Sequence, residues 1–259
     1  MAIYHRRVDA IRRSRISALI HTLLALGSVC ATHRATAQEP PVQVEIVPSE
    51  VEWSQFPPYC KARYSITLYA LGTPFEGRVS QAEIQSWKQQ MGQAWEALHH
   101  YCYGLVQMSR APLIKDQNRR EYLYDRASDE FGYAFRNTDH DNPFNAKVAV
   151  QLSMAFRAKN KTDQALRYAN EAQKIDPKLD TGYSASALIL RQAGKLNEAV
   201  EVLKRGLAAV DGESAELNYF LGLTYFDLKN LDLAREYADK AYALGYPLPG
   251  LRNRLARAR

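Results

Sequence analysis

The chain is poor in the residues from which metal sites and nucleophilic sites are built. Its 259 residues include 3 cysteines and 6 histidines, and of the histidines only His99, His100 and His140 follow residue 37. The spacings CxxC, HExxH and CxxCH are all absent, as is a glycine-rich run that could hold a phosphate. The sequence therefore gives no positive case for catalysis and implies no cofactor.

The chain also lacks an excess of one charge outside its first residues. The formal net charge is +6, but residues 1–37 hold six arginines and one acid. Subtracting them leaves 28 basic and 27 acidic residues in the remainder, a net charge of +1. A surface that binds polyanions needs a clear positive excess, so no nucleic-acid partner is expected.

Long hydrophobic runs are missing as well, because the longest one, residues 16–31, is shorter than the roughly 18 residues of a membrane-spanning helix. This run follows several arginines and precedes the small residues ATA, the order of zones in a secretory signal peptide. We predict a signal peptide over 1–37 with cleavage after Ala37, a periplasmic or secreted protein, and no direct membrane insertion afterwards. The alternative is an inner-membrane anchor that retains residues 16–31.

Export would change the chemistry of the cysteines. Once Cys30 is removed with the leader, only Cys60 and Cys102 remain, and cysteines in an oxidising compartment usually pair. We expect a disulfide between them. An alternative places a thiol- or metal-dependent function at Cys60, Cys102 and His99, with the repeats described below recruiting substrate. His99 lies one helical turn from Cys102 and could lower the pKa of its thiol.

The residues after the leader change character along the chain. Residues 38–50 are rich in proline and acid and indicate a linker, and residues 51–81 contain repeated proline and glycine and indicate a loop-rich collar. From there to residue 137, apolar residues recur at spacings of three and four. We predict one long helix ending before Pro112 and a second over 117–137, which together form a helical hairpin at 82–137.

The strongest signal is an internal repeat. Ala165, Ala199 and Ala234 stand 34 and 35 residues apart, and each is followed by a small or apolar residue four places on and another seven places on. A second helical pattern precedes each of these segments across a short polar turn. A period of about 34 residues made of two helices is typical of a solenoid.

The residues at the small and large positions of these segments resemble the tetratricopeptide repeat family over about residues 146–247. The residues that carry the likeness are Leu152, Ser153, Phe156, Ala165, Ala172, Pro177, Tyr183, Ala187, Leu190, Leu221, Gly222 and Tyr225. Asp211 and Asn218 depart from the family pattern. The resemblance implies an all-α fold, a right-handed α-solenoid of helix pairs with an irregular N-terminal collar. It further implies that residues 82–137 form a degenerate repeat, that residues 146–247 form three repeats, and that residues 248–259 form a capping helix.

In this family the first helix of each pair lines a concave groove. The resemblance therefore implies a partner-binding groove formed by Lys147, Gln151, Met154, Arg157, Ser184, Leu188, Arg191, Gln192, Tyr219, Leu223 and Phe226. The lysine and asparagine set with which some members clamp a C-terminal carboxylate is absent. We expect a non-enzymatic scaffold that binds a peptide or helix of another envelope protein. The oligomeric state is left open.

Overall fold

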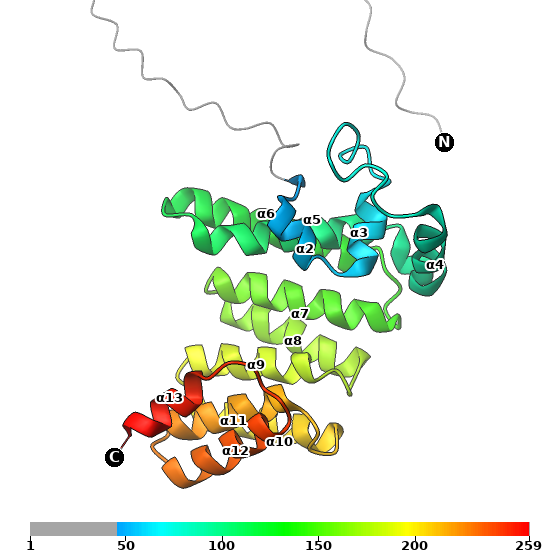
Figure 1. Cartoon of the computed structure of the whole chain (residues 1–259). Helices are drawn as coiled ribbons and strands as arrows, with labels where there is room; N and C mark the ends of the chain where they lie inside the picture. Colours follow the sequence, from blue (N-terminus) through cyan, green and yellow to red (C-terminus); the bar gives the residue numbers. More distant parts are fainter. Residues whose placement is uncertain (1–45, 259) are drawn as a thin grey trace, which may run out of the picture. The chain divides into compact units, whose positions relative to one another are not determined.

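The computed structural model describes residues 46–258, and within this range the chain is helical and contains no strand (Figure 1). The elements in chain order are α2 (Glu50–Gln55), α3 (Pro58–Tyr64), α4 (Gln81–Met91), η1 (Gly92–Trp95), α5 (Leu98–Arg110), η2 (Ala111–Leu113), α6 (Gln117–Arg136), α7 (Pro143–Ala158), α8 (Thr162–Ile175), α9 (Asp180–Gln192), α10 (Leu196–Ala209), α11 (Ala215–Asp227), α12 (Leu231–Ala243) and α13 (Gly250–Arg257). The predicted leader, 1–37, and most of the predicted linker lie outside the described residues.

Helices α7 to α12 form three consecutive pairs, and each pair packs against the next. Within a pair, α7 contacts α8, α9 contacts α10 and α11 contacts α12, while the first helices α7, α9 and α11 also contact one another in sequence. The alanines that define the repeat are buried at these contacts, with Ala165, Ala199 and Ala234 all 0% exposed. The predicted all-α solenoid of helix pairs is confirmed.

The turn inside each pair has the same backbone form. One residue in each turn has a positive φ: Asn160 (56°), Gly194 (74°) and Lys229 (65°). Such a left-handed residue ends the first helix and reverses the chain. The three residues are spaced by the repeat period, so they mark equivalent points of the three repeats.

The prediction of one long helix over the first part of the hairpin is wrong. Helix α4 stops at Met91, Gly92 takes a φ of 54°, and the chain passes through η1 before α5 begins at Leu98. A left-handed residue cannot continue an α-helix, and glycine adopts this conformation without steric cost. The hairpin is therefore made by α5 and α6, while α4 packs on α3.

The collar has more structure than the sequence indicated. Its first half forms α2 and α3, and only residues 65–80 are turns and bends. Trp53 of α2 stacks on Phe75 of the turn segment with 4.7 Å between ring centroids. Ile46, inside the predicted linker, is 3% exposed and belongs to the same core. Aromatic packing, which periodicity does not reveal, therefore orders this region.

Helix α13 closes the C-terminal end of the array. Leu251 of α13 is fully buried against α11. A Cβ added to Gly222 of α11 would lie only 2.9 Å from Cδ2 of Leu251. The absence of a side chain at Gly222 lets α13 approach α11 closely. Among residues 46–258, no helix is both long and apolar enough to cross a membrane.

Candidate protein-binding surface

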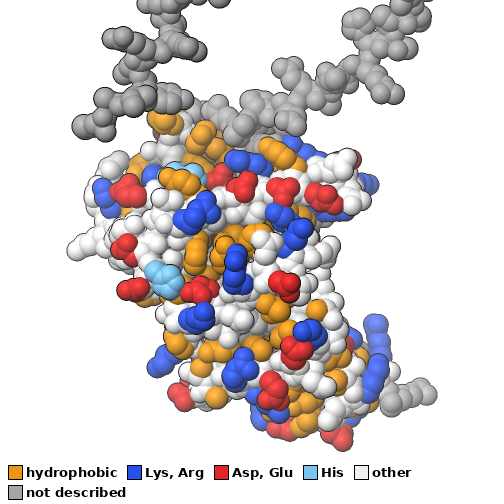
Figure 2. Space-filling model, turned by 180° about the vertical axis from the view of Figure 1, so that it is seen from behind, with side chains coloured by type: hydrophobic (Ala, Val, Ile, Leu, Met, Phe, Trp, Pro, Cys, Tyr) orange, Lys and Arg blue, Asp and Glu red, His pale blue; other side chains and the backbone are white. Residues whose placement is uncertain are grey.

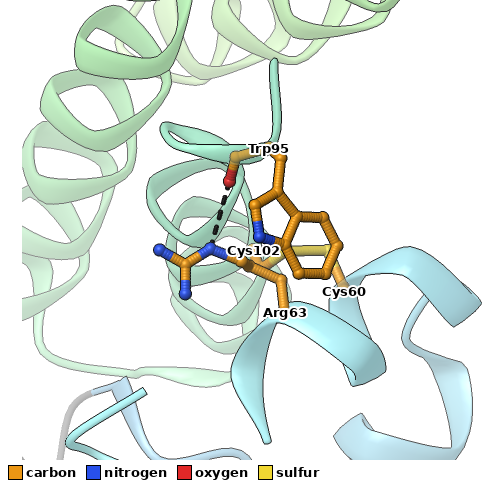
Figure 3. The surroundings of a disulfide bond; sticks show 4 residues. All are labelled: Cys60, Arg63, Trp95 and Cys102. Atoms are coloured by element: carbon orange, nitrogen blue, oxygen red, sulfur yellow. Dashed lines mark hydrogen bonds between the residues drawn. A yellow bond between two sulfur atoms is a disulfide. The ribbon is translucent and has the colours of Figure 1, made fainter. Parts of the chain in front are cut away.

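The expected disulfide is present and joins the collar to the hairpin. Cys60 of α3 and Cys102 of α5 have their sulfur atoms 2.02 Å apart, and both residues are 0% exposed. Figure 3 shows Arg63 and Trp95 beside the bond, with Arg63 Nε donating a hydrogen bond to the backbone oxygen of Trp95 at 3.1 Å. Since both sulfurs are in the bond, neither can act as a thiolate nucleophile or metal ligand.

His99, the histidine of the alternative site, forms a hydrogen bond with an arginine side chain. Its Nδ1 lies 3.2 Å from Nη2 of Arg63, and because a guanidinium only donates hydrogen bonds, Nδ1 is the acceptor and the ring is neutral. Burial, followed by the charges of Arg63 and His100, lowers the pKa of His99 to about 4. His99 therefore acts as a neutral hydrogen-bond acceptor that holds Arg63 in place.

The other two histidines of the described residues contact different carboxylates. His100 Nδ1 lies 2.5 Å from Glu130 Oε2, and His140 Nε2 lies 2.9 Å from Glu171 Oε1. Within the described part of the chain, no three His, Cys, Asp or Glu side chains are grouped in a way that could hold a metal ion. The geometry thus assigns the histidine-rich stretch of α5 to packing and hydrogen bonding.

The predicted groove residues fall into three classes of exposure on α7, α9 and α11. Two are exposed, Lys147 and Gln192. Two are buried, Ser184 at 3% and Tyr219 at 8%. The half-buried ones are Gln151, Met154, Arg157, Leu188, Arg191, Leu223 and Phe226. Most of the predicted residues are thus reachable from solvent, whereas Tyr219 packs against Tyr246 with ring centroids 4.0 Å apart.

Charged side chains gather where these first helices end. Arg191 of α9 donates from Nη2 to Asp227 Oδ2 at 2.6 Å, and Arg254 of α13 donates from Nη2 to the other oxygen, Oδ1, at 2.8 Å. Arg157 of α7 lies close enough that the charge of Arg191 contributes to lowering its pKa, although burial is the larger cause. The end of the face therefore holds three guanidinium groups and one carboxylate.

The beginnings of α9 and α11 have the opposite character. Glu216 accepts a short hydrogen bond from Ser184 Oγ, and Ser214 Oγ donates to Asp180 Oδ2 at 2.7 Å. Burial raises the pKa of Glu216, the hydrogen bond from Ser184 opposes this, and the charge of Asp180 adds to it. The face thus has an acidic edge and a basic edge, with apolar side chains between them.

Sequence reasoning missed two members of the basic edge, Asp227 and Arg254. Asp227 is the last residue of α11, and Arg254 lies 27 residues further along in a different helix. The guanidinium carbon of Arg254 sits 4.3 Å from the ring centroid of Phe226. Neither periodicity nor the repeat pattern predicts this contact, because it depends on how α13 folds back over α11.

A cleft lies elsewhere, on the second helices of the pairs. It has a volume of about 730 Å³, is lined chiefly by α10 together with residues of α8, α9 and α11, and contains none of the predicted groove residues. Its walls carry polar and charged side chains such as Glu201, Lys204 and Arg205. On the face shown in Figure 2, basic and acidic side chains are interspersed with no broad patch of one sign.

Two segments of the chain match a known family of repeats. Residues 146–179 and 185–247 match the family described as Tetratricopeptide repeat. No curated protein matches the chain. Among solved structures, TTC0263, a thermophilic TPR protein of Thermus thermophilus, is 19% identical with a TM-score of 0.50, covering 77% of this chain and 97% of that one. YrrB, described as a TPR protein with an unusual peptide-binding site, is 20% identical with a TM-score of 0.46, covering 68% and 81%. The two family matches identify tetratricopeptide repeats at residues 146–179 and 185–247.

Proposed function

We propose that this protein is a non-enzymatic interaction scaffold that binds an extended segment or helix of a partner protein on the face formed by α7, α9 and α11. Tetratricopeptide repeats generally mediate protein–protein interaction. The observation that carries the proposal is the composition of this face, where half-buried Met154, Leu188, Leu223 and Phe226 lie beside arginines. Methionine, aromatic side chains and arginine are enriched in protein interfaces.

The cellular location is part of the same proposal. We infer that residues 1–37 are an export signal and that the partner is another protein of the bacterial envelope. The Cys60–Cys102 disulfide supports an oxidising compartment, because such bonds persist there and are rare in the cytosol. Mass spectrometry of the mature N-terminus tests this point: a chain that begins at Gln38 is expected, and a full-length chain would instead indicate a retained anchor.

Site-specific photo-crosslinking in the producing cell tests the binding face. A photoreactive residue at Leu188 or Leu223 should give a discrete adduct of higher mass, whereas the same residue at Glu201 of α10 or Asp239 of α12 should not. These control positions are exposed on the second helices of their pairs. The proposal fails if the control positions give the same adduct, or if positions on the first helices give none.

A further inference from the structure

The basic edge of the binding face repeats with the period of the solenoid. Arg157 and Arg191 each lie three residues before the left-handed turn residue of their repeat, and Phe226 holds that position in the third repeat. There Arg254 of α13 covers the Phe226 ring and brings a guanidinium to the place where the first two repeats have their own arginine. The first two pairs and helix α13 thus present one guanidinium each along the same edge.

These guanidinium groups have too few acceptors. Asp227 is shared between Arg191 and Arg254, so three positive charges face one negative charge. Within residues 46–258, Arg157 forms no ion pair, and the Nε atoms of Arg157 and Arg191 are buried without a hydrogen-bond acceptor. These Nε atoms are closed to solvent, so a partner could reach only the terminal nitrogens. Those of the half-buried Arg157 have no acceptor among the described residues and are open to a carboxylate, with which a guanidinium forms strong hydrogen bonds.

We propose that this edge binds carboxylate side chains of an acidic segment in the partner protein, an inference that rests on the proposed function of the face. A single terminal carboxylate could serve only one or two of the three groups, whereas a series of aspartate or glutamate side chains could serve all of them. Packed helices lie about 8–10 Å apart. An extended polyproline-type chain returns to the same side every third residue, about 9 Å further on. Acidic residues at every third position therefore match the spacing of α7 and α9, the packed helices that carry Arg157 and Arg191.

Peptide binding to the purified protein, followed by fluorescence anisotropy, tests the inference. The probe is a labelled proline-rich peptide with glutamate at every third residue and blocked ends. Its counterpart has glutamine at the same positions, and a third peptide has glutamine with a free C-terminal carboxylate. The glutamate peptide should bind at least about tenfold more tightly than either of the others, because hydrogen bonds between charged groups are the strong ones. Equal affinity for the glutamate and glutamine peptides overturns the inference, and tightest binding of the third peptide replaces it by a terminal-carboxylate site.

The variant Arg157→Gln links the effect to the structure. It should lower the affinity for the glutamate peptide about tenfold without lowering the unfolding midpoint, since Arg157 loses no ion pair. Arg205→Gln, the same change at an exposed position on α10, should change neither quantity. Unaltered peptide affinity in Arg157→Gln would refute the role of the edge. If the crosslinks at Leu188 and Leu223 also appear in Arg157→Gln at the wild-type level, the binding face stands and only the acidic ligand is wrong.

Discussion

The double variant Cys60→Ala/Cys102→Ala should lose a large part of the stability of the N-terminal region. The disulfide closes a loop with a sequence separation of 42 residues. In the chain-entropy model, restricting an unfolded loop of that length contributes about 4 kcal/mol to the free energy of unfolding. Alanine is the suitable replacement because both positions are 0% exposed, and a buried serine hydroxyl without a partner would add a cost of its own.

The structure provides a probe for where the loss occurs. All 3 tryptophans of the chain, Trp53, Trp87 and Trp95, lie in the collar and the first helices after it. Trp53 and Trp95 belong to the same buried cluster as the disulfide. Tryptophan fluorescence therefore follows the N-terminal region, whereas far-UV circular dichroism follows all helices.

Urea unfolding recorded with both probes measures the effect. With a urea dependence of about 2–3 kcal/mol per molar, a loss of about 4 kcal/mol should lower the fluorescence midpoint by about 1.3–2 M. The circular dichroism transition should retain a component from α7 to α12 near its original midpoint. Wild-type protein that is unfolded, reduced and refolded in reductant is the control and should behave like the variant. Identical fluorescence midpoints for the oxidised wild type and the variant would refute the loop-closure argument.

Three further substitutions probe single contacts. Gly104→Ala would put a Cβ 2.5 Å from a ring carbon of Phe131. Urea unfolding should therefore show that overpacking lowers the free energy of unfolding by about 1–3 kcal/mol, and an unchanged midpoint would mean that the Phe131 ring moves aside without cost. His99 has a folded pKa of about 4 against 6.5 for the unfolded chain, so the unfolded state binds more protons between these values and stability falls as pH drops from 6.5 to 4. His99→Gln should reduce that slope in thermal melts, and equal slopes would contradict the assignment. Leu251→Ala should lower the free energy of unfolding by about 2–5 kcal/mol and speed amide hydrogen exchange in α13. Unaltered exchange would contradict the role of Leu251 in anchoring α13.

The repeats could be predicted from sequence because their packing is local and periodic. Ala165, Ala199 and Ala234 each pack against the partner helix of their pair. The same spacing of small residues therefore recurs in the sequence wherever the same helix packing recurs in the structure. The break at Gly92 could not be predicted with the same assurance, because glycine is tolerated inside helices and only the fold requires its positive φ there. The helices of the collar could not be predicted for a related reason, because contacts between aromatic residues distant in sequence, such as Trp53 and Phe75, order this region.

In the candidate site too, some residues could be predicted from the repeat and others could not. Arg157 and Arg191 could be found from the repeat, since they occupy the same position in successive pairs. Asp227 and Arg254 could not, because their pairing spans 27 residues and two helices. The neutral state of His99 was equally hidden, since it follows from the approach of Arg63 across the disulfide-linked helices.

The origin of the third guanidinium couples the number of repeats to the charge of the binding face. Inserting one more helix pair after α12 would carry α13, and Arg254 with it, to the new end of the array. Phe226 would then lose the cation above its ring, and Asp227 would keep only Arg191 as a partner. Lengthening or shortening this solenoid by duplication of a repeat would thus alter what it recognises as well as its size, unless the inserted pair brought its own arginine.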